Sequence, residues 1–184
     1  MNSVSYPRLC EQSLAFPVRS AKSAPILRAA TAADVDALCE IERRAFEYPW
    51  SRREFEFCVE APRYTGVIVA EGSEPLGYAF YEKRARSYRL LSCAVVESRR
   101  REGLGTRLLA AVAAALDEGR PEISCVVREG NVPAQLFLRN FGFRALWTVK
   151  GYYRATREEA YRMSYTREEL RLSADCVRQR LLAR

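Results

Sequence analysis

The sequence feature that most constrains the fold of this chain is a glycine-bearing turn between an apolar run and an Ala/Leu-rich run. The apolar run spans Leu90 to Val96, and the turn is Arg99-Arg100-Arg101-Glu102-Gly103-Leu104-Gly105-Thr106. After the turn, Leu104 and Leu108 begin an apolar face with helical spacing. We therefore expect a strand, a short turn and the N-terminus of a helix. The unpaired N–H groups at such a helix start form an anion site that suits a phosphate group.

Two common phosphate motifs are absent from this turn. No Gly-Lys-Ser or Gly-Lys-Thr follows it, and it lacks the pattern Gly-x-Gly-x-x-Gly, so neither an ATP site nor a dinucleotide site is indicated. An arginine cluster before a helix is, taken alone, most often a solvated surface turn. The pair Gly103 and Gly105 favours a ligand site over that alternative, because glycine lets a ligand approach the backbone closely.

The composition removes several classes of enzyme. The chain has no histidine, which excludes a Ser-His-Asp triad, a Cys-His dyad and every zinc site that contains histidine. Its six cysteines stand singly, without a Cys-x-x-Cys pair, and indicate reduced core residues in a cytoplasmic protein. We accordingly expect no metal.

The net charge is positive and comes almost entirely from arginine. A formal charge of +7 suits a polyanionic partner such as RNA, a CoA-like ligand or an acidic peptide, although a general preference for arginine explains it equally well. No basic run alternates with aromatic residues, so we predict no specific nucleic-acid partner. No apolar run approaches the ~20 residues that span a bilayer, so we predict no membrane partner.

Periodicity and capping signals predict one domain over residues 25–165, with the element order β-α-α-β-β-β-α-β-α-β-β. Because strands and helices do not alternate strictly, we expect an α+β (mixed α/β) fold with a central mixed sheet and helices on both faces. Residues 1–24 are expected to form a disordered tail, and residues 166–184 an amphipathic helix. The predicted strands are 25–29, 65–71, 76–82, 88–96, 122–128, 143–149 and 159–165. The predicted helices start at Thr31, Ser51, Leu104 and Asn131. The helix that starts at Leu104 is expected to end at Gly119 and Pro121.

The turn resembles the pyrophosphate loop of the GNAT superfamily of acetyl-CoA-dependent N-acetyltransferases, Arg/Gln-x-x-Gly-x-Gly/Ala, at Arg100-Arg101-Glu102-Gly103-Leu104-Gly105. The resemblance runs from Pro25 to Tyr165 and is closest to the ribosomal-protein-alanine N-acetyltransferase group. It implies a GNAT-like sheet. The other matching segments are Ile41-Glu42-Arg43-Arg44-Ala45-Phe46 with Pro49-Trp50-Ser51, Val127-Arg128-Glu129-Gly130-Asn131 with Ala134 and Phe141-Gly142-Phe143, and Gly151-Tyr152-Tyr153 with Glu159-Ala160-Tyr161-Arg162-Met163.

The resemblance implies a binding site for acetyl-CoA as co-substrate. Asn131 would contact the cofactor near its thiol end, although a simple helix N-cap is the plainer interpretation of this residue. The Val95 N–H would face the thioester oxygen as an oxyanion donor. The pantetheine amides would pair with Cys93, Ala94 and Val95, and the pyrophosphate would lie on the loop backbone at Arg100, Arg101, Gly103, Leu104, Gly105 and Thr106.

The sequence departs from the family at the two residues that transfer protons. Well-studied members carry a glutamate base and a tyrosine acid where this chain has Val126 and Leu138. An α-amine, with a pKa of about 7.7–8.0, is partly neutral near pH 7.5, whereas a lysine amine at about 10.4 is not. As substitutes we expect water-mediated deprotonation through Glu47, Tyr152 or Tyr153, in the two loops that the resemblance places around an acceptor peptide, residues 47–50 and 151–153.

The resemblance and the residues that carry it predict an enzyme that transfers the acetyl group of acetyl-CoA to the N-terminal α-amine of a protein. A ribosomal protein is a candidate acceptor. One alternative is a GNAT that acts on a small-molecule amine, which would need an acidic pocket for a cationic substrate. The other is a catalytically weak module that binds acyl-CoA, which the missing Glu/Tyr pair and the charge of +7 would suit.

Overall fold

All strands of the computed structural model, which describes residues 24–153 and 158–169, lie in a single sheet. The seven strands have the order β1-β2-β3-β4-β5-β7-β6, and only β4 and β5 are parallel. The predicted mixed sheet is confirmed. The strands are β1 Ile26–Ala29, β2 Tyr64–Glu71, β3 Glu74–Lys83, β4 Tyr88–Val95, β5 Glu122–Arg128, β6 Arg144–Tyr153 and β7 Glu158–Thr166.

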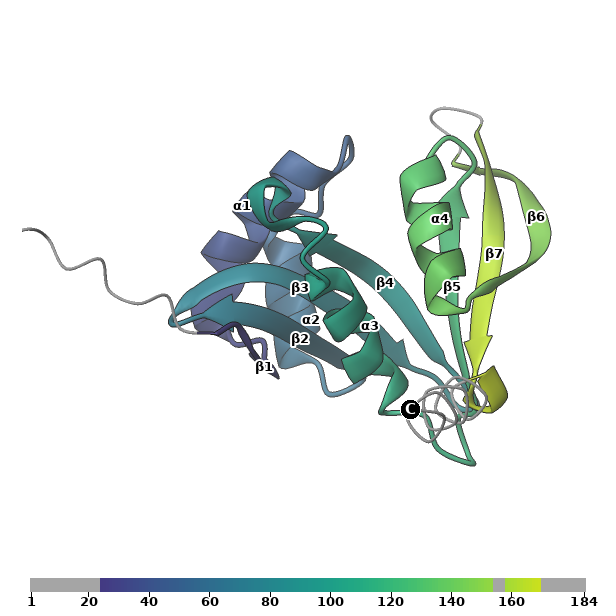
Figure 1. Cartoon of the computed structure of the whole chain (residues 1–184), viewed down its shortest axis with the longest axis horizontal. Helices are drawn as coiled ribbons and strands as arrows, with labels where there is room; N and C mark the ends of the chain where they lie inside the picture. Colours follow the sequence, from purple (N-terminus) through teal and green to yellow (C-terminus); the bar gives the residue numbers. More distant parts are fainter. Residues whose placement is uncertain (1–23, 154–157, 170–184) are drawn as a thin grey trace, which may run out of the picture.

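Helices cover both faces of this sheet, as predicted. In Figure 1, α3 and α4 lie in front of the strands, and α1 and α2 lie behind them. Along the described parts of the chain, no helix combines the length and the apolarity needed to cross a membrane. The helices are α1 Val35–Ala45, α2 Arg52–Glu60, α3 Leu104–Ala113 and α4 Val132–Phe141, with short 3₁₀ helices η1 Ala32–Asp34 and η2 Glu97–Arg99.

Two apolar cores, one on each face of the sheet, hold the layers together. Leu38 and Phe55 are buried between the helices α1 and α2 and the strands β2 to β4. Leu108 and Ile123 are buried in the second core, which α3 and α4 cover. Both α1 and α3 repeat apolar residues every three or four positions, and this spacing keeps one helical face on the sheet.

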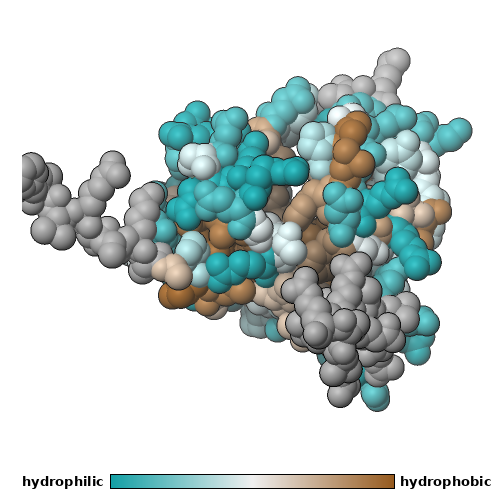
Figure 2. Space-filling model, in the orientation of Figure 1, coloured by the Kyte–Doolittle hydropathy of each residue, from teal (hydrophilic) through white to brown (hydrophobic). Residues whose placement is uncertain are grey.

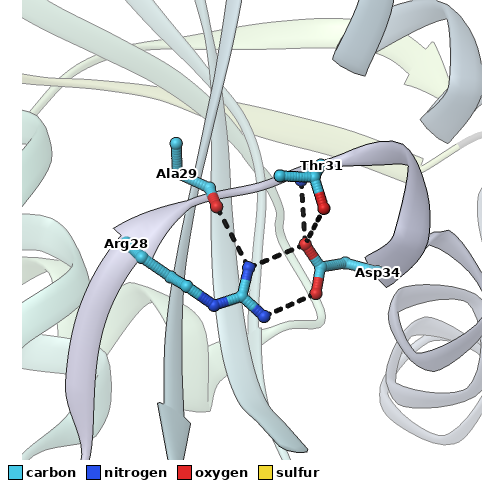
Figure 3. Close-up of polar contacts among 4 residues, drawn as sticks. All are labelled: Arg28, Ala29, Thr31 and Asp34. Atoms are coloured by element: carbon cyan, nitrogen blue, oxygen red, sulfur yellow. Dashed lines mark hydrogen bonds and ion pairs between the residues drawn. The ribbon is translucent and has the colours of Figure 1, made fainter. Parts of the chain in front are cut away.

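A buried carboxylate fixes the start of α1. Asp34 accepts hydrogen bonds from the backbone N–H and the hydroxyl of Thr31, both at 2.8 Å, and from the Arg28 guanidinium at 2.7 and 2.8 Å (Figure 3). The hydrogen bonds from Arg28 lower the pKa of Asp34 to about 2. The helix start that the sequence predicted at Thr31 is thereby confirmed.

The strands β4 and β5 pair briefly and then diverge (Figure 1). Their register contains only Tyr88↔Ile123 and Arg89↔Ser124. Beyond this point, no described strand lies against the β5 side of β4. The β4–β5 gap therefore opens the backbone of β4, from Leu90 to Val95, to pairing with a ligand.

Two of the predicted element ends were wrong by more than two residues. The helix α3 ends at Ala113, well before Gly119, because the N–H groups of Ala115 and Leu116 donate to carbonyls only three residues back, at 3.1 Å, and tighten the chain. The strand β6 continues through an irregular register to Tyr153, so Tyr152 and Tyr153 lie in a strand rather than a loop.

Most of both predicted terminal segments lies outside the described residues. This applies to the tail predicted for residues 1–24, except Ala24, and to the helix predicted for residues 166–184 beyond Glu169. The start of that helix is described. The Thr166 N–H and hydroxyl donate to the Glu169 carboxylate at 2.6 and 3.0 Å, which is the capping contact that the sequence predicted.

Candidate active site

The predicted phosphate loop has a backbone conformation that suits an anion. Arg101 and Gly103 are both left-handed, with φ of 67° and 78°, and Gly103 is the N-cap of α3. Left-handed residues within a turn direct successive N–H groups toward one point and form an anion-binding nest. A left-handed arginine costs roughly 1–2 kcal/mol, and such strain is typical of ligand sites.

The two glycines of the loop are needed for different reasons. No atom lies within 4 Å of the position that a Cβ of Gly103 would occupy, so this glycine is required by its backbone conformation. A Cβ at Gly105 would lie 3.0 Å from the ring of Phe137 in α4. Gly105 therefore allows α4 to approach the start of α3, a role in packing that the sequence analysis did not identify.

Arginine side chains fasten the loop to the sheet. Arg99 pairs with Glu102 at 2.8 Å and with Glu71 of β2 at 3.4 Å. The Arg100 guanidinium donates to the Val95 carbonyl at 3.2 Å. Arg101, like Arg100, is exposed. The loop can thus offer an anion its backbone N–H groups together with the exposed cation of Arg101.

The strand β4 presents its backbone to the β4–β5 gap. The Val96 N–H donates to the Leu76 carbonyl of β3 at 2.8 Å. Because N–H directions alternate along a strand, the Val95 N–H points away from β3 and toward the gap, the direction that an oxyanion donor requires. Burial raises the pKa of the Cys93 thiol to about 12. The thiol therefore stays protonated and is no nucleophile.

The surface beside this backbone is apolar. Figure 2 shows apolar residues, in brown, in the hollow between α3 and α4. Cys93 and Val95 of β4 and Phe137 of α4 are partly buried against the core that α3 and α4 cover. A narrow apolar hollow with backbone donors along one side fits an alkyl-amide chain that ends in a pyrophosphate. The loop, the gap and the hollow together fit acetyl-CoA.

Arg128, at the end of β5, brings the two predicted acceptor segments together. Its guanidinium lies 4.7 Å from the ring centre of Tyr48, between α1 and α2, and 3.8 Å from that of Tyr153 in β6. It also forms an ion pair with Glu158 at the start of β7. We call Tyr48, Arg128, Tyr153 and Glu158 the acceptor frame. The frame connects elements that are far apart in the sequence.

The predicted proton-transfer substitutes lie at or beside this frame. The Tyr152 hydroxyl accepts a hydrogen bond from Arg89 of β4 at 2.8 Å, and the Tyr152 ring packs edge-on against Tyr153 at 5.0 Å between ring centres. Burial raises the pKa of Tyr153. Glu47 is exposed, and its charge raises the pKa of the neighbouring Tyr48 hydroxyl. A role for Glu47, Tyr152 or Tyr153 in proton transfer stays a prediction.

The two positions where the resemblance implies proton-transfer residues carry apolar side chains, Val126 and Leu138. Leu138 is buried in the core under α4. Val126 pairs with Arg162 of β7, whose guanidinium lies 5.3 Å from the ring centre of Trp147. Residues that pair across antiparallel strands face the same side of the sheet, so Val126, Arg128 and Arg162 share one face. The position where the resemblance implies a base therefore lies on the same face as two arginines, which pair with Glu158 and Glu122.

Asn131 is the N-cap of α4. Its side-chain oxygen accepts a hydrogen bond from the Ala134 N–H at 3.1 Å. The plainer interpretation of this residue as a helix cap is confirmed, and a contact with the cofactor stays a prediction.

Glu42 is a buried carboxylate whose chemistry the sequence analysis did not identify. It is only 2% exposed, and it accepts hydrogen bonds from the Trp50 backbone N–H and the Ser92 hydroxyl, both at 3.2 Å. Burial raises its pKa to about 7. Glu42 lies four residues after Leu38, at the edge of the apolar stripe of α1, and this spacing was the one sign of its burial.

Other features of the described residues add no chemistry to this site. A hollow of about 710 Å³ between α4 and the strands β6 and β7 is lined by Phe141, Tyr161 and Tyr165 among others, and contains no residue of the loop or the acceptor frame. Within the described ranges, no group of three or more His, Cys, Asp or Glu residues could hold a metal ion. The described cysteines are free thiols.

The chain belongs to the GNAT acetyltransferase family: the sequence pattern of the Acetyltransferase (GNAT) family matches residues 35–143, more than half of the chain. It is an acetyl-CoA-dependent acyltransferase. The N-alpha-acetyltransferase of Sulfurisphaera tokodaii is 29% identical over 152 residues, covering 75% of this chain and 90% of that protein. The [ribosomal protein bS18]-alanine N-acetyltransferase of Escherichia coli K12 is 28% identical over 134 residues, covering 71% and 90%.

Solved structures share the fold. The ribosomal-protein-S18-alanine N-acetyltransferase from Escherichia coli superposes with a TM-score of 0.70 at 25% identity, covering 78% of this chain and 94% of that one. Arabidopsis thaliana NAA60 in complex with acetyl-CoA has a TM-score of 0.70 at 17% identity, covering 78% and 98%. The predicted GNAT fold is confirmed, and so is acetyl-CoA as co-substrate.

Proposed function

We propose that this protein acetylates the α-amine at the N-terminus of a protein or peptide. The observation that carries the proposal is the acceptor frame, in which Arg128 joins Tyr48 and Tyr153 beside the β4–β5 gap. An extended peptide end fits between two such segments, whose rings and guanidinium offer contacts to its backbone. The names of the two relatives, which describe N-terminal and alanine acetylation, support the same acceptor class.

The cofactor side of the site follows from the loop and β4. In this proposal the N–H groups of Arg101, Gly103, Leu104, Gly105 and Thr106 hold the pyrophosphate, with the dipole of α3 behind them. The backbone of Cys93, Ala94 and Val95 pairs with the pantetheine amides, and the Val95 N–H donates to the thioester oxygen. Arg100 acts indirectly, since its side chain holds the loop on the Val95 carbonyl.

The acceptor side lacks a strong base, and this favours one class of amine. With Val126 in the base position, the site must receive an amine that is already neutral. At pH 7.5 an α-amine meets that condition far more often than a lysine amine does. Water held by Glu47, Tyr152 or Tyr153 is the proposed path for the proton that the amine releases.

Acetyl transfer to a panel of amines tests the proposal. We expect peptides with a free α-amine and a small first residue to be acetylated faster than lysine side chains in N-terminally blocked peptides. Replacing Tyr152 and Tyr153 singly by Phe tests their hydroxyls, and Tyr152→Phe also removes the contact with Arg89. Equal rates on blocked and unblocked peptides, or a preference for small amines, would contradict the proposal.

A second candidate function is supported by the apolar residues at positions 126 and 138. A module that binds acyl-CoA with little turnover would need neither a base nor an acid there. Acetyl-CoA binding without acetylation of any amine would favour it. The small-amine alternative gains less support, because the carboxylates of Glu158 and Glu122, which could receive a cationic substrate on this face, are already paired with Arg128 and Arg162.

Two finer expectations belong to the proposal. A ribosomal protein is proposed as acceptor because one relative is named for ribosomal protein bS18. A cytoplasmic location is proposed because the described cysteines are free thiols, as is usual in a reducing compartment.

A further inference from the structure

Glu42 connects the two sides of the site. Its helix, α1, lies behind the sheet (Figure 1). Its carboxylate accepts one hydrogen bond from the acceptor segment and one from β4. One donor is the backbone N–H of Trp50, which ends the segment that carries Tyr48. The other is the hydroxyl of Ser92 in β4, the residue before Cys93. One carboxylate therefore holds both the acceptor segment and the cofactor strand.

A second contact fixes the Ser92 end of this arrangement. The Tyr78 hydroxyl of β3 lies 3.1 Å from the Ser92 hydroxyl, and both residues are buried. Ser92 lies beside an irregularity of β4, where the register with β3 shifts between Phe80 and Tyr81. The hydrogen bonds of Glu42, Ser92 and Tyr78 thus hold β4 at a bulge, immediately before the backbone that faces the gap.

The burial of Glu42 is costly, which argues against a purely structural role. A carboxylate that is 2% exposed loses its hydration, and none of the hydrogen bonds described for it comes from a cation. Aliphatic residues of similar size at such positions are often neutral or stabilising. A polar group retained in an apolar core at the junction of two site-forming segments indicates a role in function.

We propose that Glu42 is a positioning residue that sets the distance between the acceptor segment, residues 47–50, and the thioester-binding strand β4. This inference rests on the proposed function and names a residue that does not itself touch substrate. It predicts that loss of both hydrogen bonds weakens use of the peptide acceptor and leaves acetyl-CoA binding intact, because neither hydrogen bond reaches the phosphate loop, which follows the C-terminal end of β4.

Two substitutions of Glu42 separate the hydrogen bonds from the charge. In Glu42→Gln the amide oxygen can accept from Trp50 and the amide N–H can donate to Ser92, so both contacts persist. Glu42→Leu keeps the volume and removes both contacts. For Glu42→Leu we expect the KM of a peptide with a free N-terminal alanine to rise about tenfold, with a dissociation constant for acetyl-CoA within twofold. In Glu42→Gln, the KM of the peptide and the dissociation constant for acetyl-CoA should both stay within about twofold of the wild-type values.

Asp34→Asn is the matched control. Asp34 is also a buried carboxylate, at the start of the same helical segment, but its partners are Arg28 and Thr31 (Figure 3). Its loss should lower thermal stability and leave the KM of the peptide unchanged. A rise in that KM in Asp34→Asn would mean that any loosening of this region reproduces the effect, which would overturn a specific role for Glu42.

Amide exchange of Trp50 tests the anchoring without any turnover. The Trp50 N–H should be protected in the wild type and in Glu42→Gln, and should exchange faster in Glu42→Leu. Unchanged protection and unchanged KM in Glu42→Leu would overturn the proposal while the N-terminal acetyltransferase assignment stands. If no peptide is acetylated by the wild type, the proposed function fails, and the exchange measurement still decides whether Glu42 anchors the segment.

Discussion

Single residues decide the chemistry of this site, and the polarity of two of them is unexpected for their positions. Glu42 is a carboxylate in an apolar core, where a leucine would avoid the cost of desolvation. Val126 is apolar at the position where the resemblance to the family implies a base. We expect the first residue to make the stability of the fold sensitive to pH, and the second to make the reaction rate depend on the protonation of the substrate.

The stability of the fold should fall with rising pH because of Glu42. The carboxyl group releases its proton near its ordinary pKa of 4.5 when the chain is unfolded and near 7 when it is folded. The folded state therefore binds the extra proton between these values, and the stability contributed by neutral Glu42 is lost as pH rises through 7. Besides Trp50 and Ser92, the negative charge of Glu54 on α2 acts on this group.

Unfolding of Glu42→Gln measures this effect. The variant should be as stable as the wild type at pH 4 and more stable by ~3 kcal/mol at pH 8, as measured by urea unfolding. Asp34→Asn should behave in the opposite way, because the pKa of Asp34 is lowered to about 2. That variant should be less stable at pH 7 and approach the wild type as pH falls through 3. A constant difference for Glu42→Gln from pH 4 to 8 would contradict the prediction.

The wild-type rate should rise with pH through the pKa of the substrate α-amine, because the site selects neutral amine. Val126→Glu should increase kcat/KM at pH 7 by at least about tenfold. Arg162, which pairs with position 126 across the sheet, would keep the new carboxylate ionised. Val126→Gln is the control, because glutamine has the shape of glutamate and carries no charge. A wild-type rate that levels off well below pH 7.5 would reveal a base elsewhere.

The contact between two helices, α3 and α4, shapes the phosphate loop. Gly105 lies at the start of α3, against the ring of Phe137 from α4. The loop that is proposed to bind the pyrophosphate therefore packs against α4, the helix that follows β5. Packing against Phe137 and the proposed approach of the ligand would both require a small residue at position 105. A double substitution can separate these two requirements.

Gly105→Ala should destabilise the protein by up to about 2 kcal/mol, because the new Cβ would lie 3.0 Å from the Phe137 ring, and crowding the ring costs more than the roughly 1 kcal/mol that alanine gains over glycine in a helix. Phe137→Leu in the same chain should recover most of this loss, since the shorter side chain leaves room. A double-mutant cycle in urea gives the coupling. Additive effects of the two substitutions would show that the contact is unimportant. If the double variant recovers stability but still binds acetyl-CoA weakly, the loss of affinity comes from the Cβ blocking the approach of the ligand to the loop.

At the scale of the whole molecule, the sheet is divided at the β4–β5 gap. The strands β1 to β4 pack on α1, α2 and α3, while β5, β7 and β6 form the other half with α4 (Figure 1). The two halves share two registered residue pairs between β4 and β5. A ligand seated in the gap contacts both halves, so its binding should stabilise the entire fold.

Saturating acetyl-CoA should therefore raise the melting temperature, with a stabilisation of about 2.7 kcal/mol at one hundred times its Kd. Gly103→Val should abolish most of the shift. Gly72→Val is the matched control, because Gly72 has a φ of 61° and the same open surroundings but lies in the turn between β2 and β3. Both variants should lose intrinsic stability, and only Gly72→Val should keep the acetyl-CoA shift. Equal shifts in both would refute the phosphate loop.

The sequence by itself determined the local structure of this protein. Capping pairs such as Thr31 with Asp34 and Ser51 with Glu54 located helix starts, because each cap involves groups only three residues apart. The phosphate loop was equally local, since a glycine turn and the helix start that follows it need no distant partner. The absence of histidine and the residues Val126 and Leu138 were likewise evident without a structure.

Only the tertiary structure decided which distant groups meet. The burial of Glu42, the stacking of Arg128 between Tyr48 and Tyr153, and the contact of Gly105 with Phe137 each join elements far apart in the chain. The end of α3 at Ala113 and the length of β6 also depended on such surroundings. Periodicity reports which face of an element is apolar, but burial and pKa depend on what covers that face, which is set by packing across the whole sheet.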